Sequence, residues 1–183
     1  WIQAINTTPV RALTNGSGVI VGVVDSGIYG SHPDLTGKVL NSTSFVNTLY
    51  GYPDSESSAD DFGHGTYVAG IIAGGGVLSS AYAGVAPGVK LINAKCMNTF
   101  GRGFSAGIIL AIEWAVNQSV DVINLSIGGG AADPDDPMSL AVDGAVRSGV
   151  VVAVSAGNGG PYYSSGSAPA AARLAISVGA SNG

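Results

Sequence analysis

Five short runs rich in Val and Ile are the feature that most constrains how this chain of 183 residues can fold. Each run is almost continuously apolar, as a strand is when both faces of its sheet are covered. Segments with helical patterns lie between the runs, and this alternation is typical of a parallel sheet. We therefore predict an α/β fold: a mostly parallel sheet with helices on both faces. The predicted strands are residues 19–24, 89–97, 120–125, 150–154 and 174–178, with a weaker one at 38–46.

Three segments have helical patterns, and the clearest is 105–117, where Ile109, Ile112, Ala115 and Val116 form an apolar stripe. The other predicted helices are 65–73 and 137–148, and the polar segments 49–61 and 131–136 are predicted to be surface loops. No repeat or linker divides the chain. We predict that residues 1–183 are part of one domain, whose sheet is incomplete at the C-terminus because a few small residues directly follow the last run.

Composition restricts the class of partner. Lys and Arg total 7 against 12 Asp and Glu, a formal net charge of −5, so the chain cannot form the clustered basic surface that nucleic acid binding requires. No run reaches the roughly 20 apolar residues that span a bilayer. Charged residues are only 10% of the chain, against about 25% in a typical soluble domain, which suits a compact secreted or extracellular enzyme. The single cysteine, Cys96, is interpreted as a buried apolar residue.

Three polar residues lie where predicted elements begin or end. Asp25 follows the first run, at the edge of a parallel sheet where sites form, although an Asp there is about as often part of a turn. His64 lies among small residues at a helix start, where a carboxylate and a nucleophile could both reach it, but a lone His is more often structural. Asn158 follows the run 150–154 and could donate to an oxyanion, yet Asn-Gly is also a common turn. None of the three decides a function alone.

Their order and surroundings resemble the subtilisin-like serine proteases, which form the subtilase family or peptidase S8. The motifs that carry the resemblance are 23–28 (VVDSGI), 32–35 (HPDL), 64–66 (HGT), 84–87 (GVAP), 122–128 (VINLSIG) and 155–158 (SAGN). The resemblance runs from about Val19 to Ala180, and it identifies the chain as the N-terminal part of a catalytic domain.

The resemblance implies a serine endopeptidase that hydrolyses peptide bonds with an Asp/His/Ser triad. Asp25 would orient His64, His64 would act as general base and then acid, and Asn158 would donate to the oxyanion. A peptide or protein substrate would bind as an extended strand between the segments 100–103 and 125–130, which the resemblance implies are themselves strands. The implied substrate-binding residues are Phe100, Gly101, Arg102, Gly103, Leu125, Ser126, Ile127, Gly128, Ala153, Ala156 and Gly157. A propeptide or the remaining C-terminal part of the domain is a further expected partner.

One family motif is missing, because Gly-Thr-Ser-Met-Ala, which carries the nucleophilic serine, occurs nowhere in the chain. We therefore expect a segment absent here to supply the serine, and this chain alone to be inactive. Tyr67 replaces a second His that is usual in the family. No cofactor is expected for the chemistry. A structural calcium ion is left open but unsupported: Asp34 matches one ligand position, yet 74–80 lacks the usual polar ligands. The acidic loop 133–136 is interpreted as solvated rather than metal-binding.

Other classes fit less well. The sequence 103–107 (GFSAG) matches the nucleophile elbow of α/β-hydrolases, but both histidines precede Ser105, against the chain order of that fold, so Ser105 is predicted to be an N-cap. The sequence 101–106 (GRGFSA) approximates a dinucleotide-binding loop without the acidic residue expected at the end of the next strand. The remaining alternative is a subtilisin-like binding or scaffolding fragment without catalysis.

Overall fold

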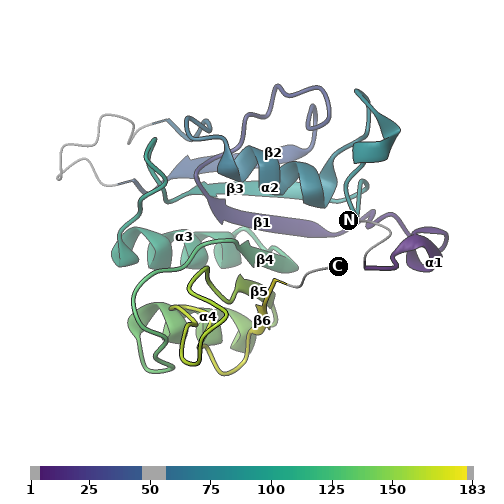
Figure 1. Ribbon diagram of the computed structural model, residues 1–183. Coiled ribbons are helices and arrows are strands. Elements are labelled where there is room, and N and C mark those ends of the chain that lie inside the picture. The colour runs from purple at the N-terminus through teal and green to yellow at the C-terminus, as the bar shows by residue number, and fades with distance from the viewer. Residues whose placement is uncertain (1–4, 47–56, 181–183) are drawn as a thin grey trace.

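A six-stranded, fully parallel sheet forms the centre of the computed structural model, which describes residues 5–46 and 57–180 (Figure 1). The strands are β1 (Ile20–Asp25), β2 (Val39–Ser44), β3 (Lys90–Lys95), β4 (Val122–Leu125), β5 (Val151–Ser155) and β6 (Ile176–Val178). Their order in the sheet is β2-β3-β1-β4-β5-β6, and each neighbouring pair is parallel. The predicted α/β fold is confirmed, and all six predicted strands are present.

Helices cover both faces of this sheet (Figure 1). The helix α2 (His64–Ala73) packs on one face against β1 and β3, while α3 (Ser105–Asn117) and α4 (Pro137–Arg147) pack on the other. A short helix, α1 (Thr8–Arg11), and a 3₁₀ turn, η2 (Ser80–Tyr82), were not predicted. No helix in the described part of the chain is both long and apolar enough to cross a membrane.

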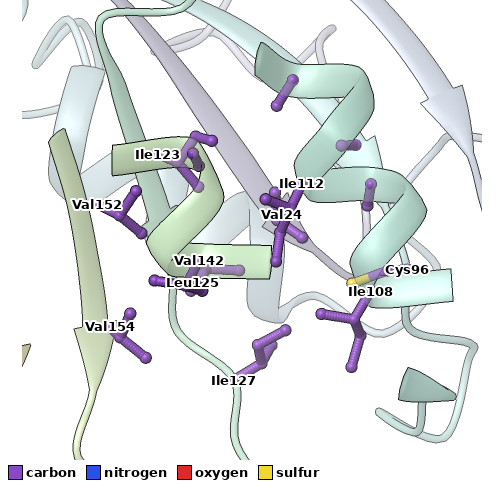
Figure 2. Close-up of a cluster of buried hydrophobic side chains, with 14 of the residues drawn as sticks. Val24, Cys96, Ile108, Ile112, Ile123, Leu125, Ile127, Val142, Val152 and Val154 are labelled. Atoms are coloured by element: carbon purple, nitrogen blue, oxygen red, sulfur yellow. The ribbon is translucent and has the colours of Figure 1, made fainter. Parts of the chain in front are cut away.

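Alternation along β1 explains why the apolar runs are continuous. Val21 and Val23 belong to the cluster that includes Val68 of α2, whereas Val24 belongs to the cluster that includes Ile112 of α3. Successive side chains of a strand point to opposite faces, so a strand covered on both faces needs apolar residues at almost every position. Figure 2 shows the second cluster, in which Cys96 is buried as predicted, and this burial raises the pKa of its thiol.

The parallel arrangement places the carboxyl ends of all six strands along one edge of the sheet. The central strand β1 ends at Asp25, and its neighbours β3 and β4 end at Lys95 and Leu125. Next to β4, β5 ends at Ser155. Ligand sites of open α/β sheets form along this edge, so segments that are far apart in the sequence meet there.

Two predicted details change in the structure. Ser105 is the first residue of α3, and Phe104 holds the N-cap position with an extended backbone (φ −99°, ψ 144°), so the prediction of Ser105 as N-cap is wrong. The extended backbone ends one residue earlier than an N-cap at Ser105 requires, which places Ser105 inside the helix. The predicted helix 137–148 ends one residue earlier, at Arg147. In the predicted loop 49–61, residues 57–61 are irregular, and 49–56 lie outside the described residues.

The acidic loop 131–136 is irregular, as predicted, and its carboxylates have structural partners. Asp136 is the N-cap of α4, and its side chain accepts from the backbone N–H of Met138 at 2.8 Å. Asp135 pairs with Arg173 at 3.0 Å. These contacts hold the start of α4 and the segment before β6 together.

Candidate active site

The end of β1 and the start of α2 bring Asp25 and His64 into contact. Nδ1 of His64 lies 2.7 Å from Oδ1 of Asp25, whose side chain is fully buried, while the His64 side chain is 37% exposed. A carboxylate can only accept, so Nδ1 donates this hydrogen bond. A neutral His64 then carries its free lone pair on Nε2, which is the arrangement of a general base whose orientation a carboxylate fixes.

Burial makes the charged form of Asp25 costly. It raises the pKa of Asp25, and the nearby charge of Asp60 acts in the same direction, while hydrogen bonds from His64 and the Ser26 N–H act against it. Oδ2 of Asp25 has no hydrogen-bond partner within the described residues. A buried carboxylate with so few donors gains most when the imidazole next to it becomes positively charged, so Asp25 is suited to stabilise a protonated His64.

Two glycines allow α2 to start this close to β1. A Cβ atom at Gly65 would overlap the carbonyl oxygen of Gly27 and lie 3.2 Å from Cβ of Asp25. Gly27 itself has φ +110°, and a Cβ there would lie 2.7 Å from the carbonyl oxygen of Ser58. Side chains at either position would push the start of α2 away from Asp25, so the glycines of the two motifs set the contact between Asp25 and His64.

Asp60, which the sequence analysis did not single out, bonds to the neighbours of both residues. Its Oδ1 accepts from the Ser26 hydroxyl at 2.9 Å and the Gly63 N–H at 2.8 Å. Its Oδ2 accepts from the N–H and the hydroxyl of Thr66, at 2.8 and 2.5 Å. Burial raises the pKa of Asp60, but these hydrogen bonds outweigh it and hold the pKa below its usual value. The one sequence signal was an Asp just before a helix start, where acceptors are favoured.

Buried polar groups of β3 anchor the segment that carries Asp60. The fully buried Nζ of Lys95 donates to the carbonyl oxygen of Ala59 at 3.0 Å and to Oδ1 of Asp61 at 2.6 Å. Two positions earlier, on the same face of the strand, Nδ2 of Asn93 donates to the carbonyl oxygen of Ser58 at 2.8 Å. The segment 58–61 is therefore bonded at three points to the strand beside β1.

Both predicted peptide-binding segments line a pocket of about 560 Å³. The first contributes Gly101, Arg102 and Gly103, and the second contributes Ile127 and Gly128 among others. The remaining lining includes apolar residues of α3, α4 and the 168–169 segment: Ile108, Met138, Ala168 and Pro169. The structure thus brings together two segments that α3 and β4 separate in the sequence.

These segments are not strands, contrary to the prediction. Oδ1 of Asn98 accepts from the N–H groups of Phe100 and Arg102, both at 3.0 Å, which turns the chain there. Phe100 is 66% exposed in this turn and is absent from the pocket lining. Leu125 ends β4, and its fully buried side chain lies in the apolar cluster of Figure 2, so it can take part in binding only through its backbone. The hydroxyl of Ser126, which follows it, accepts from Asn124 Nδ2 at 2.9 Å.

The other predicted binding residues lie at the end of β5. Ala153 and Ala156 are half-buried there, and Gly157, with φ +100°, is exposed. A Cβ at Gly157 or at Gly128 would overlap the side chain of Ser167, whose Oγ is buried without a hydrogen-bond partner in the described ranges. Ser167 therefore packs between Gly128 and Gly157, which come from two different predicted binding segments. Sequence reasoning missed it because nothing but tertiary contact distinguishes it from neighbouring serines.

Asn158 follows these residues at the same edge of the sheet as Asp25. Its side chain is exposed and makes no hydrogen bond within the described part of the chain. Its amide is therefore available to a ligand. Its predicted role as an oxyanion donor stays a prediction, as do the catalytic roles of Asp25 and His64.

The residues around Asp34 do not fit a calcium ion. Oδ1 of Asp34 accepts from the backbone N–H groups of Val77 and Leu78. An oxygen that faces two N–H donors is not directed toward a cation, and the segment 74–80 (GGGVLSS) offers no carboxylate. Within residues 5–46 and 57–180, no three His, Cys, Asp or Glu side chains form a cluster that could hold a metal ion.

Known proteins with similar sequences and a similar fold point to one family. The model of the "Subtilase family" matches residues 16–183. Serine protease AprX of Bacillus subtilis (strain 168) is 38% identical over 177 residues, which cover 90% of this chain and 38% of AprX. Subtilisin E of the same strain is 42% identical over 171 residues, which cover 91% of this chain and 42% of subtilisin E.

A solved structure, the crystal structure of a cold adapted subtilisin-like serine proteinase, matches with a TM-score of 0.73 and 30% identity. The match covers 90% of this chain and 55% of that protein. The chain therefore spans about half, or less, of the length of these similar proteins.

Proposed function

The chain belongs to the subtilase family, and from that premise we propose that it supplies the Asp–His half of a subtilisin-type serine endopeptidase. The observation that carries the proposal is the 2.7 Å hydrogen bond between buried Asp25 and half-exposed His64 at the carboxyl edge of the sheet. The nucleophilic serine would come from a segment outside these 183 residues. We accordingly propose that this chain alone does not hydrolyse peptides.

In the proposed mechanism, Nε2 of His64 takes the proton of the serine hydroxyl as the hydroxyl attacks the peptide carbonyl. Asp25 holds the ring with Nδ1 protonated and stabilises the imidazolium that forms. His64 then returns the proton to the leaving amine. The exposed amide of Asn158 donates to the oxyanion, and losing such a donor costs about 3 kcal/mol of transition-state stabilisation, a value known from the subtilisins themselves.

The proposed substrate is an extended peptide held between the segments 101–103 and 127–128. Three of these five residues are glycines, so a peptide backbone can approach the chain closely. The adjoining pocket of about 560 Å³ is lined partly by Ile108 and Met138, which suits an apolar side chain of the substrate. A binding or scaffolding fragment without catalysis would use the same groove, and the experiment below separates the two.

Exposed apolar residues at the end of the sheet support a further partner, the remaining part of the catalytic domain. Leu174, Ile176 and Val178 are 46%, 56% and 52% exposed, at the β6 edge. Burying them would stabilise an association through the hydrophobic effect. A propeptide partner and a secreted or extracellular location stay predictions from the family resemblance and the composition.

The test uses the protein encoded by the full reading frame. We expect that frame to encode Gly-Thr-Ser beyond residue 183, and the product to react with a fluorophosphonate probe. His64→Ala should reduce peptidase turnover by several orders of magnitude, a loss known from the subtilisins themselves. His32→Ala is the matched control, because His32 bonds to the backbone of Asp34 and not to Asp25, and it should keep turnover within a few fold.

Unchanged turnover in His64→Ala would remove His64 from the mechanism. A full-length protein that encodes no such serine and does not react with the probe would leave the non-catalytic alternative as the function of this fold.

A further inference from the structure

We propose that Asp60 is a positioning residue, which fixes Asp25 and His64 relative to each other without hydrogen bonding to either. The inference deepens the proposed endopeptidase function and rests on it. It starts from the hydrogen bonds of a single carboxylate, which reach the residue that follows Asp25 and residues on both sides of His64.

On the Asp25 side, the link runs through the hydroxyl of Ser26. This hydroxyl donates to Oδ1 of Asp60 at 2.9 Å and accepts from the N–H of Gly65 at 2.9 Å. Ser26 directly follows Asp25, and Gly65 directly follows His64. One hydroxyl therefore joins the two chain segments next to the reacting pair, and Asp60 sets the direction in which that hydroxyl donates.

On the His64 side, Asp60 performs the task of an N-cap. The first N–H groups of a helix have no acceptor within the helix, and Gly63 at the N-cap position has no side chain to supply one. Asp60 accepts from the N–H groups of Gly63 and Thr66 at 2.8 Å each, and from the Thr66 hydroxyl. The positive end of the helix dipole favours a carboxylate in this place. His64 lies between these two anchored residues.

The carboxylate is itself held in place. Lys95 and Asn93 of β3 bond to the backbone of Ala59 and Ser58, directly before Asp60, and Lys95 also pairs with Asp61. Asp60 therefore belongs to a segment that is fixed on β3. The strand β3 is in turn hydrogen-bonded along its length to β1. Hydrogen bonds through β3 therefore connect the segment that carries Asp60 to the strand that carries Asp25.

The bonds of Asp60 add directional constraints to the apolar packing of α2, alongside the bond from the N–H of Tyr29 to the Thr66 hydroxyl at 2.9 Å. Val68 and Ala69 of α2 share an apolar cluster with Val21 and Val23 of β1, and the hydrophobic effect that stabilises this cluster is non-directional. A hydrogen bond between Nδ1 of His64 and Oδ1 of Asp25 is directional, so a small displacement of α2 weakens it strongly. A misplacement of about 1 Å can cost roughly 100-fold in rate, so the bonds of Asp60 have a direct catalytic consequence.

The first test needs no nucleophile. The Nδ1 proton that His64 shares with Asp25 should give a low-field ¹H NMR signal in this chain. In Asp60→Asn, we expect this signal to disappear or its proton to exchange with water about tenfold faster or more, while the circular dichroism spectrum keeps its shape. The matched control is Asp121→Asn, because Asp121 also accepts a backbone N–H, that of Ile20 at 2.8 Å, at the opposite edge of the sheet. It should leave the signal unchanged.

A second pair of variants decides the question if Asp60→Asn does not fold. Thr66→Val keeps the shape of the side chain but removes the hydroxyl, which donates to Asp60 and accepts from the N–H of Tyr29 at 2.9 Å. The signal should therefore weaken, and Thr66→Ser, which keeps both bonds, should restore it. In the full-length protein, Asp60→Asn should lower kcat by roughly 10- to 100-fold with little change in KM.

The proposal is overturned if Asp60→Asn lowers thermal stability while the signal persists, because Asp60 would then be structural only. An equal loss of signal in Asp121→Asn overturns it too. The NMR result stands whether or not the full-length protein proves to be a peptidase.

Discussion

The buried carboxylate of Asp25 illustrates how a single residue can favour function over stability. Its charged form has lost most of its water and has hydrogen bonds on only one of its two oxygens. A residue selected for stability at this place would be neutral. The hydrogen bond between this carboxylate and the His64 ring indicates why the charge is kept.

The cost of burying the charged Asp25 carboxylate predicts how the stability of the fold depends on pH. The pKa of Asp25 is raised above its ordinary value of 3.8 in the folded protein, mainly by burial. The folded state therefore holds the proton to higher pH than the unfolded state, and stability falls as the pH rises from about 3.8 through the folded pKa. Asp25→Asn removes this penalty and keeps an oxygen that can accept from Nδ1. We expect it to raise the melting temperature by a few degrees at pH 7 and not at pH 3, measured by circular dichroism. A variant less stable than the parent at pH 7 would contradict the assignment.

Residues of the candidate site could be predicted from the sequence to different extents. Asp25, His64 and Asn158 follow or begin regular elements, so the sequence pattern indicates where they lie. Asp60 and Ser167 lie in polar loops, where a solvated side chain and a bonded one have the same local sequence. What distinguishes Asp60 is a hydroxyl 34 positions earlier, and this contact exists only once β1 and α2 have packed together.

At the scale of elements, Asp34 fastens the loop after α2 to the segment between β1 and β2. Its carbonyl oxygen accepts from the N–H of Gly75 at 2.9 Å, and its carboxylate accepts from Val77 and Leu78. The loop therefore bonds directly to a carboxylate that would otherwise be available to a cation.

We therefore propose that this loop is stable without calcium. EDTA should leave the melting temperature unchanged, whereas Asp34→Ala should lower the free energy of unfolding by about 1–3 kcal/mol, because it leaves backbone N–H groups of the loop without their acceptor. Differential scanning calorimetry with and without EDTA measures both effects. Glu113→Ala, which removes an exposed carboxylate of the same charge on α3, is the control and should cost little. A fall in melting temperature with EDTA as large as that of Asp34→Ala would show that a bound cation holds the loop.

Regular elements were more predictable than the segments between them. Strands buried on both faces reveal themselves as continuous apolar runs, and the stripe on 105–117 predicted α3 with its bounds. The elements α1 and η2 are too short to show a period. The turn at 98–102 depends on one Asn side chain that bonds to two N–H groups, which a pattern of apolar residues does not reveal.

The molecule as a whole is asymmetric, because the two edges of its sheet differ in character. The outer strand β2 has the sequence VLNSTS, with polar side chains at four of its six positions. The outer strand β6 exposes Ile176 and Val178, and Leu174, two positions before the strand, is exposed as well. Natural proteins commonly protect an edge strand with polar or charged residues, and only the β2 edge of this sheet follows that practice.

An apolar, unprotected edge predicts self-association of the isolated chain. Two copies that pair or pack through β6 would bury Ile176 and Val178, and burying each such side chain contributes about 1.5–3 kcal/mol. We expect sedimentation equilibrium to show dimers or larger species at micromolar concentrations, and Ile176→Lys to restore the monomer, because a charge on an edge strand opposes pairing. Leu110→Lys is the matched control, since Leu110 is 51% exposed on α3, which packs against β1 and β3, and it should leave association unchanged. If the unsubstituted chain is monomeric throughout this range, the β6 edge does not require a partner. If the control disperses the oligomers as Ile176→Lys does, they form through another surface.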